Sequence, residues 1–106
     1  MIWLEMISVR TGTPVVAEQA LDFCREVSKS VQTGELLKFA VYCNGTYPTD
    51  VSIHLLWKSN PGQSSMLGRE VCTALGDLGL VSHTLWIEQK ESGVVNGLEF
   101  YSRRVA

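Results

Sequence analysis

Apolar and polar residues alternate along four segments of the chain, the pattern of strands that bury one face. These segments are residues 2–10, 36–43, 51–58 and 80–89. Residues 14–31 and 67–78 instead place apolar side chains three or four positions apart, which is the period of an amphipathic helix. The pattern therefore predicts the order strand, helix, strand, strand, helix, strand.

Residues at the ends of the two helices indicate where each helix begins and ends. Thr13 is predicted to cap the first helix, with Pro14 at the first helical position, where its missing N–H costs nothing. Ser64 or Ser65 is predicted to cap the second helix, which Gly79 ends. The apolar stripes are Ala17, Ala20, Leu21, Cys24, Val27 and Val31 in the first helix, and Leu67, Val71, Ala74, Leu75 and Leu78 in the second.

This order of elements predicts an α+β fold, a ferredoxin-like βαββαβ sandwich. Right-handed crossovers place both helices on one face of a four-stranded antiparallel sheet. Two glycines within the second helix, Gly68 and Gly76, are small enough to let it pack closely on the sheet. Residues 1–89 form the predicted domain. Residues 90–106 form a C-terminal tail, in which the Asn96–Gly97 pair predicts a small extra hairpin.

The more continuously apolar side of the middle strands is predicted to face the helices. It consists of Leu37, Phe39, Val41, Val51, Ile53, Leu55 and Trp57. The uncovered side then carries Tyr42, His54, Leu56 and Trp86. Such a surface is too apolar to be left in water. A second copy of the chain is the predicted partner, pairing sheet to sheet into a dimeric barrel.

Residues 2–89 resemble the dimeric α/β-barrel superfamily. The resemblance lies in the order of elements, the short second hairpin and the aromatic face around His54 and Trp86. That superfamily includes the antibiotic-biosynthesis-monooxygenase-like proteins. The resemblance implies a ferredoxin-like homodimer. Its members include cofactor-independent oxygenases, haem-degrading enzymes, isomerase-like enzymes and ligand-binding modules, so the resemblance does not choose an activity.

His54 is the candidate catalytic residue. It lies in mid-strand on the predicted uncovered face, in phase with Leu56. A histidine there can act as a general base or as a haem ligand, and the alternative is a hydrogen-bonded interface histidine. His83 shares a face with Val81 and Leu85, which predicts that it points toward the helices. Two histidines on opposite faces of a sheet cannot form one metal site.

Four further residues are candidates for ligand binding: Tyr42, Leu56, Trp86 and Glu5. The aromatic pair can form the walls of a pocket for a flat molecule, and dimer packing is the alternative role. Glu5 lies within an apolar strand. If it faces the barrel, burial should raise its pKa and make it a proton acceptor; otherwise it is expected to pair with a lysine such as Lys38.

Composition and charge exclude several classes of function. The 106 residues carry a net charge of -2, so no basic surface for nucleic acid is expected. No apolar run reaches the roughly 20 residues of a membrane helix, and residues 1–5 lack the basic start of a signal peptide. Three widely spaced cysteines without a CxxC pair predict reduced thiols in the cytoplasm rather than a zinc site.

Together these observations predict a small homodimeric ligand-binding or interaction module, with no tightly bound cofactor and no metal. The partners expected are a second copy of the chain and a small apolar or aromatic ligand. The alternatives are a cofactor-independent monooxygenase-like enzyme acting on an aromatic or quinone-like molecule, and a haem-binding protein that uses His54.

Overall fold

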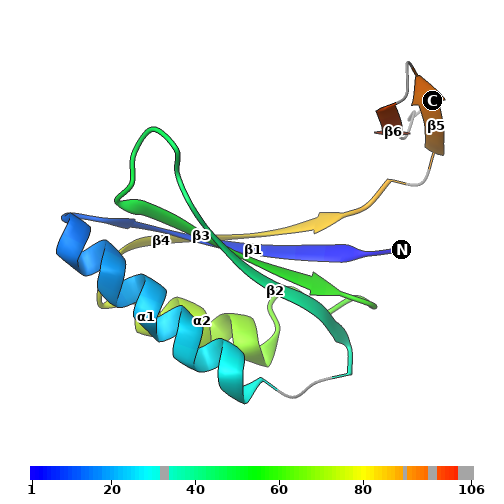
Figure 1. Ribbon diagram of the computed structural model, residues 1–106. Helices are drawn as coiled ribbons and strands as arrows, with labels where there is room; N and C mark the ends of the chain where they lie inside the picture. Colours follow the sequence, from blue (N-terminus) through cyan, green and yellow to red (C-terminus); the bar gives the residue numbers. More distant parts are fainter. Residues whose placement is uncertain (32–33, 90, 96–97, 103–106) are drawn as a thin grey trace.

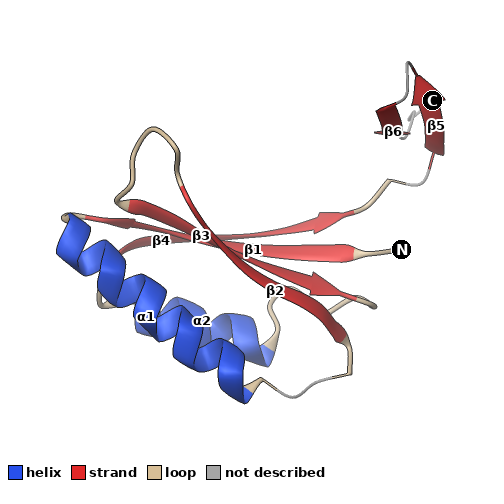
Figure 2. Ribbon diagram, viewed as in Figure 1, coloured by secondary structure: helices blue, strands red, loops and turns tan. Residues whose placement is uncertain are grey.

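The computed structural model describes residues 1–31, 34–89, 91–95 and 98–102. Figure 1 shows the helices beneath the main sheet, and Figure 2 shows the division into helix, strand and loop. The elements are β1 (Trp3–Thr11), α1 (Pro14–Ser30), β2 (Leu36–Cys43), β3 (Asp50–Trp57), α2 (Met66–Gly76), β4 (Gly79–Ile87), β5 (Glu91–Val95) and β6 (Leu98–Ser102).

The main sheet has four strands in the order β2-β3-β1-β4, and every neighbouring pair is antiparallel. The central strand β1 pairs with β3 from Trp3 opposite Trp57 to Arg10 opposite Asp50. It pairs with β4 from Trp3 opposite Ile87 to Thr11 opposite Gly79. This arrangement confirms the predicted α+β ferredoxin-like βαββαβ fold.

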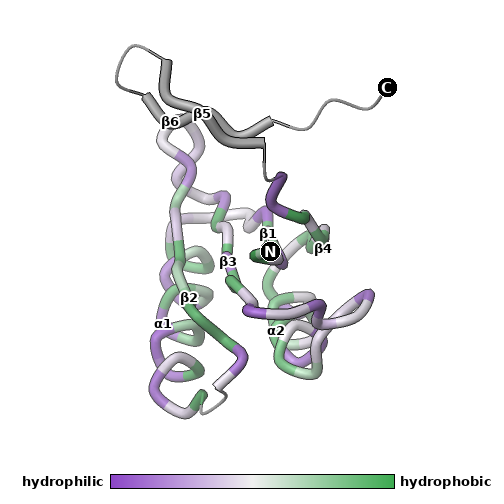
Figure 3. The backbone as a smooth tube through the Cα atoms, turned by 90° about the vertical axis from the view of Figure 1, so that its right-hand side faces the viewer, coloured by the Kyte–Doolittle hydropathy of each residue, from purple (hydrophilic) through white to green (hydrophobic). Residues whose placement is uncertain are grey.

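Both helices cover the same face of the sheet. Helix α1 packs against β1, β2 and β3, and α2 packs against β1 and β4. The view in Figure 3 shows the helices lying next to each other under the strands. The core between them consists of Ile7, Val9, Ala17, Ala20, Cys24, Val51, Ile53, Leu55, Trp57, Val71 and Leu75. In the described part of the chain, no helix packs on the opposite face of the sheet, as the sequence predicts.

The helix starts follow the predicted caps. The Thr13 side chain accepts a hydrogen bond from the Val16 amide at 3.2 Å, and Pro14 begins α1. Ser65 caps α2 by accepting a bond from the Gly68 amide at 2.8 Å. The second helix ends at Gly76, earlier than predicted. Gly79 instead belongs to β4, where a side chain would collide with the Arg10 carbonyl of β1.

One strand departs from strict alternation. The register of β2 against β3 shifts between Leu36 and Lys38. The prediction that Leu37 faces the helices is therefore wrong. Leu37 is 51% exposed, and Leu36 packs against the core in its place. An irregularity of this kind inverts the faces on either side of it, and residue types alone do not reveal it.

The three cysteines are unpaired and lie in different surroundings. Cys24 is buried in the α1 stripe, and burial raises the pKa of its thiol to about 11. Cys43 is exposed at the end of β2. Burial raises the pKa of Cys72, and the negative charge of Glu5 adds to that effect. The buried thiols are therefore held in the protonated, unreactive form.

The described part of the tail contains a small hairpin. Strands β5 and β6 pair antiparallel in a separate two-stranded sheet, from Glu91 opposite Ser102 to Val95 opposite Leu98. The Asn96–Gly97 turn that suggested it lies outside the described residues, as do residues 103–106.

Candidate functional site

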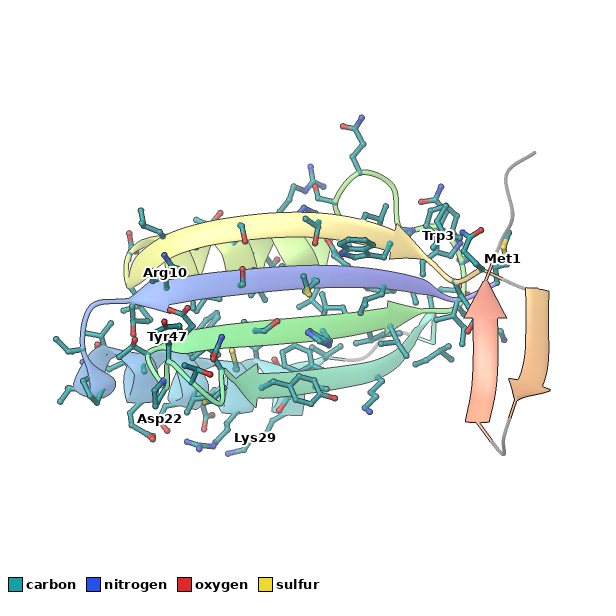
Figure 4. All side chains as sticks on the ribbon, turned by 90° about the horizontal axis from the view of Figure 1, so that it is seen from above. Met1, Trp3, Arg10, Asp22, Lys29 and Tyr47 are labelled. Carbon is teal, nitrogen blue, oxygen red and sulfur yellow. The ribbon has the colours of Figure 1, made fainter. Side chains whose placement is uncertain are left out.

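The uncovered face of the sheet carries the predicted aromatic residues. Figure 4 looks down on this face, with Trp3 near one end of the sheet and Arg10 at the other. Tyr42 is 47% exposed and Trp86 is 55% exposed. The strand register places Leu56 and Trp86 on either side of Leu4, in one row across the sheet. The structure therefore brings three predicted site residues, with His54, onto one surface.

We call this surface the open face: Leu4, Met6, Ser8 and Arg10 of β1, Lys38, Ala40 and Tyr42 of β2, Ser52, His54 and Leu56 of β3, and Leu80, Ser82, Thr84 and Trp86 of β4. It has two halves. The apolar half lies toward the Trp3 end and includes Leu4, Leu56 and Trp86. A row of serines, Ser8, Ser52 and Ser82, marks the polar half.

His54 has two neighbours on the open face. Its Nε2 is 2.9 Å from the Ser52 hydroxyl, and its ring centroid is 4.7 Å from that of Tyr42 at an angle of 48°. Burial lowers the pKa of His54, and the charge of Lys38 lowers it further. The imidazole is therefore neutral at pH 7.

No three His, Cys, Asp or Glu side chains come together as a metal site in the part of the chain that the structure describes. Across the same residues, no helix is long and apolar enough to cross a membrane.

Glu5 does not join the other predicted site residues. It lies on the opposite side of β1 from the open face, toward the helices, and it is 0% exposed. The expectation of a barrel-facing Glu5 and its alternative, a pair with Lys38, are both wrong. Glu5 shares the apolar stripe of Ile7 and Val9, so its carboxylate must find its partners inside the fold.

Four donors surround the Glu5 carboxylate, two on each oxygen. Oε1 accepts from the Trp57 indole N–H at 3.0 Å and from the Ser65 hydroxyl at 2.6 Å. Oε2 accepts from the Ser65 backbone N–H at 3.1 Å and lies 2.6 Å from His83 Nε2. A carboxylate only accepts, so His83 must carry its proton on Nε2 here. Glu5 thus links β1, β3, β4 and the start of α2. We call Glu5, Trp57, Ser65 and His83 the Glu5 network.

The pKa of Glu5 is lowered. A raised pKa is the prediction for a carboxylate that faces the barrel, and Glu5 does not face it. Burial alone would raise the pKa, but the hydrogen bonds from Ser65, His83 and Trp57 together outweigh burial and lower the pKa. The first turn of α2 adds the positive end of a helix dipole, which favours an anion at Ser65. Glu5 is therefore ionised in the folded protein.

Gly68 explains how α2 approaches this carboxylate. A Cβ at position 68 would overlap with both oxygens and the carboxyl carbon of Glu5. The predicted close packing is therefore confirmed at Gly68. It does not hold at Gly76, where a Cβ would meet nothing within 4 Å.

The lowered pKa of Glu5 predicts a specific acid sensitivity. Its stabilising contribution is complete above the ordinary pKa of 4.5 and is lost as the pH falls through the lower folded-state pKa. Urea denaturation of the wild type and of Glu5→Gln measures this. The difference in free energy of unfolding should be constant above about pH 5.5 and should narrow below about pH 4.5. A constant difference down to pH 2 would contradict the assigned charge.

A pocket of about 540 Å³ lies beside the Glu5 network, on the helix side of the sheet. It is bounded by the end of α1, the loop after β3 and the first turns of α2. Its apolar lining is Val27, Val31, Trp57, Pro61, Met66 and Leu67. Its polar lining is Ser30, Glu35, Ser59, Asn60, Ser65 and Glu70. The volume lies within the range of small-molecule sites.

The Glu5 network shapes one wall of this pocket. Trp57 and Ser65 both line it, and both donate hydrogen bonds to Glu5. The indole is only 7% exposed, and its N–H is held by Oε1. The wall is therefore fixed before any ligand arrives, which limits the entropy lost on binding.

Sequence reasoning missed this region because its residues look like core. Trp57 was expected on the helix side and His83 was expected to face the helices, and both expectations are confirmed. The available signal was that three polar groups, on Glu5, Trp57 and His83, fall on helix-facing stripes of adjacent strands. Buried polar groups must find partners, so they were candidates to meet one another.

The chain matches no protein-family model and no curated protein. It does match solved structures. A candidate antibiotic biosynthesis monooxygenase from Deinococcus radiodurans aligns with a TM-score of 0.68 at 12% identity, over 91% of this chain and 100% of that one. The monooxygenase ActVA-Orf6 of Streptomyces coelicolor, solved with the ligand nanaomycin D, gives 0.62 at 15% identity, over 88% and 89%.

SnoaB of Streptomyces nogalater, a cofactor-independent oxygenase, aligns with a TM-score of 0.56 at 11% identity, over 84% of this chain and 93% of that one. At such identities the likeness concerns the fold alone. The chain has the ferredoxin-like fold of the antibiotic-biosynthesis-monooxygenase-like proteins, as the sequence resemblance predicted.

Proposed function

We propose that this chain is a small-molecule-binding module that acts as a homodimer. Its ligand, a small apolar or aromatic molecule, occupies the pocket between the helices and the sheet. The observation that carries the proposal is the fixed Trp57 wall of a pocket of about 540 Å³. A preformed concave pocket is the usual form of a small-molecule site. The ActVA-Orf6 structure, which shares the fold and was solved with nanaomycin D, supports a small-molecule ligand.

Neither of the two bases predicted from the sequence is placed to act on a ligand in this pocket. A cofactor-independent monooxygenase-like enzyme would need a base that reaches its substrate. Both oxygens of Glu5 already accept two hydrogen bonds each, so this carboxylate has no acceptor position left for a ligand. His54 lies on the other face of the sheet. Glu5 is accordingly a positioning residue for the Trp57 wall.

The homodimer part of the proposal rests on the open face. Trp86, Tyr42 and Leu80 each expose about half or more of their surface there. Apolar area left in water costs ~25 cal/mol per Å². A second copy offers the same open face, and a two-fold pairing covers the exposed apolar side chains of both copies at once. His54 then lies in the interface between the two sheets, where a ligand held between the copies would contact it. Chemical-shift mapping distinguishes that site from the pocket on the helix side.

Two matched serines in α1 test the pocket. Ser30 and Ser28 are both exposed, and each hydroxyl donates to the backbone carbonyl three residues earlier. Only Ser30 lines the pocket. Calorimetric titration with 2-naphthylmethanol should give a dissociation constant that rises by at least about tenfold in Ser30→Trp, because the indole fills the space, a loss of about 1.4 kcal/mol. Ser28→Trp should bind as the wild type does. Absence of binding to the wild type, or equal binding by both variants, would contradict the proposal.

A further inference from the structure

The loop between β2 and β3 exposes an asparagine that is followed by a glycine. Asn44 and Gly45 come directly after the end of β2, and both are exposed. The loop is closed by its own backbone. The Asn44 N–H donates to the Asp50 carbonyl, and the Asp50 N–H donates to the Tyr47 carbonyl, each at 2.9 Å. The loop is therefore accessible to water and has a fixed backbone.

Two backbone donors of this loop hold the side-chain carbonyl of Asn44. Its Oδ1 accepts from the Thr46 N–H at 2.8 Å and from the Tyr47 N–H at 3.0 Å. Hydrogen bonds of this length polarise a carbonyl, and they stabilise the negative oxygen that forms when a nucleophile adds to its carbon. The loop therefore gives the Asn44 carboxamide the pair of donors that an acyl-transfer site gives to an oxyanion.

The nucleophile for this carbon is the backbone nitrogen of the next residue. That nitrogen can add to the asparagine Cγ and close a five-membered ring. Within the described part of the chain, the Gly45 N–H donates to no protein acceptor, so the addition breaks no hydrogen bond. Glycine also lacks a Cβ that would crowd the ring. Asn44 and Gly45 thus combine a polarised carbonyl with an unhindered nitrogen.

We propose that Asn44 is a deamidation site, which the folded chain modifies through a cyclic imide. Hydroxide removes the Gly45 amide proton, and the nitrogen bonds to Cγ of Asn44. The bond from Cγ to the side-chain nitrogen breaks, and this nitrogen takes a proton from water and leaves as ammonia, which restores the hydroxide. Water then opens the imide at either carbonyl to give aspartate or isoaspartate. Neither the helix-side pocket nor the homodimer enters this inference.

The chain offers two matched controls. Asn60 is also exposed, and its Oδ1 also accepts a backbone N–H, from Gly62 at 2.8 Å. Its successor is Pro61, whose nitrogen carries no hydrogen and cannot form the neutral imide. The second control is Gly45→Ala. A Cβ at position 45 would meet nothing within 4 Å, and φ there is not in the left-handed region, so this variant should keep the fold while its methyl group hinders ring closure.

Incubation of the full chain at pH 8 and 37 °C, followed by tryptic digestion and mass spectrometry, tests the proposal. Asn44, Asn60 and Asn96 fall in separate peptides, 39–58, 59–69 and 91–103. Deamidation adds about one dalton, and it should proceed at least about tenfold faster in peptide 39–58 than in peptide 59–69. The product should separate chromatographically into aspartate and isoaspartate forms. Gly45→Ala should slow the reaction at Asn44 by at least about tenfold.

The same chain unfolded in guanidinium chloride measures what the loop contributes. The folded chain should react at Asn44 at least as fast as the unfolded chain, because its two oxyanion donors are already in place. Slower reaction in the folded chain would show that the loop protects Asn44 and would overturn the proposal. Equal rates at Asn44 and Asn60, aspartate as the sole product, or a wild-type rate in a Gly45→Ala chain that circular dichroism shows to be folded would also overturn it.

Discussion

Glu5→Ala is expected to lower the free energy of unfolding by about 3–5 kcal/mol, a large part of the stability of a small domain. The change leaves the Trp57 N–H, the Ser65 N–H and hydroxyl, and His83 without their shared acceptor. Each buried donor without a partner carries its own desolvation cost. The substitution also opens a cavity between β1 and α2. Chemical denaturation followed by circular dichroism measures the effect.

Glu18→Ala is the control for this prediction, because Glu18 is exposed on α1. Its effect should stay within about 0.5 kcal/mol. Glu5→Gln should fall between the two, since an amide oxygen still accepts hydrogen bonds but its NH₂ group faces donors. A wild-type-like stability for Glu5→Ala would show that the Glu5 network does not hold the start of α2 on the sheet.

Leu56→Glu should dissociate the proposed homodimer. Leu56 lies in the apolar half of the open face, in the same row as Leu4 and Trp86. A carboxylate there would be desolvated in the seam, at a cost of about 3 kcal/mol or more, which corresponds to at least a hundredfold rise in the dissociation constant. Sedimentation equilibrium measures this, with the wild type expected to be dimeric at micromolar concentration.

A matched variant separates dissociation from a general effect of added charge. Val15→Glu places the same substitution on the exposed side of α1 and should leave the dimer intact. Iodide quenching gives a second readout, because Trp86 is 55% exposed in a single chain and should be shielded in the dimer. A folded wild-type monomer with quenchable Trp86 would refute the homodimer and leave the helix-side pocket unaffected.

Most of the fold can be predicted from the sequence, because the helix caps, the apolar periods and the strand alternation all indicate the same elements. The Thr13 cap and the Ser65 cap mark the starts of two helices that the apolar period also predicts. Alternation assigns Val51, Ile53 and Leu55 to the core without ambiguity. Strand order then follows from handedness and connection length. The failure at Leu37 arises from a register shift, which depends on how β2 meets β3 rather than on residue types.

The site was less predictable, because it depends on which buried polar groups meet. His54, Tyr42, Leu56 and Trp86 were placed correctly on the open face, since alternation alone decides that. The partners of Glu5 come from β3, β4 and the start of α2, and the spacing of these residues along the chain does not predict that they contact one another. A raised pKa is the prediction only for a Glu5 that faces the barrel; on the helix side, hydrogen-bond donors accompany its burial and lower the pKa. Register and helix placement supply those donors.

Chemical-shift mapping tests the central claim, that the ligand occupies the helix-side pocket, most directly. During titration of 2-naphthylmethanol into ¹⁵N-labelled protein, the account predicts shifts at the Trp57 indole N–H and at the backbone amides of Val27, Val31 and Leu67. The indole is the most informative signal, because its hydrogen bond to Glu5 fixes it in the pocket wall. Shifts confined to Tyr42, His54 and Trp86 on the open face, or no shifts at all, would contradict the account.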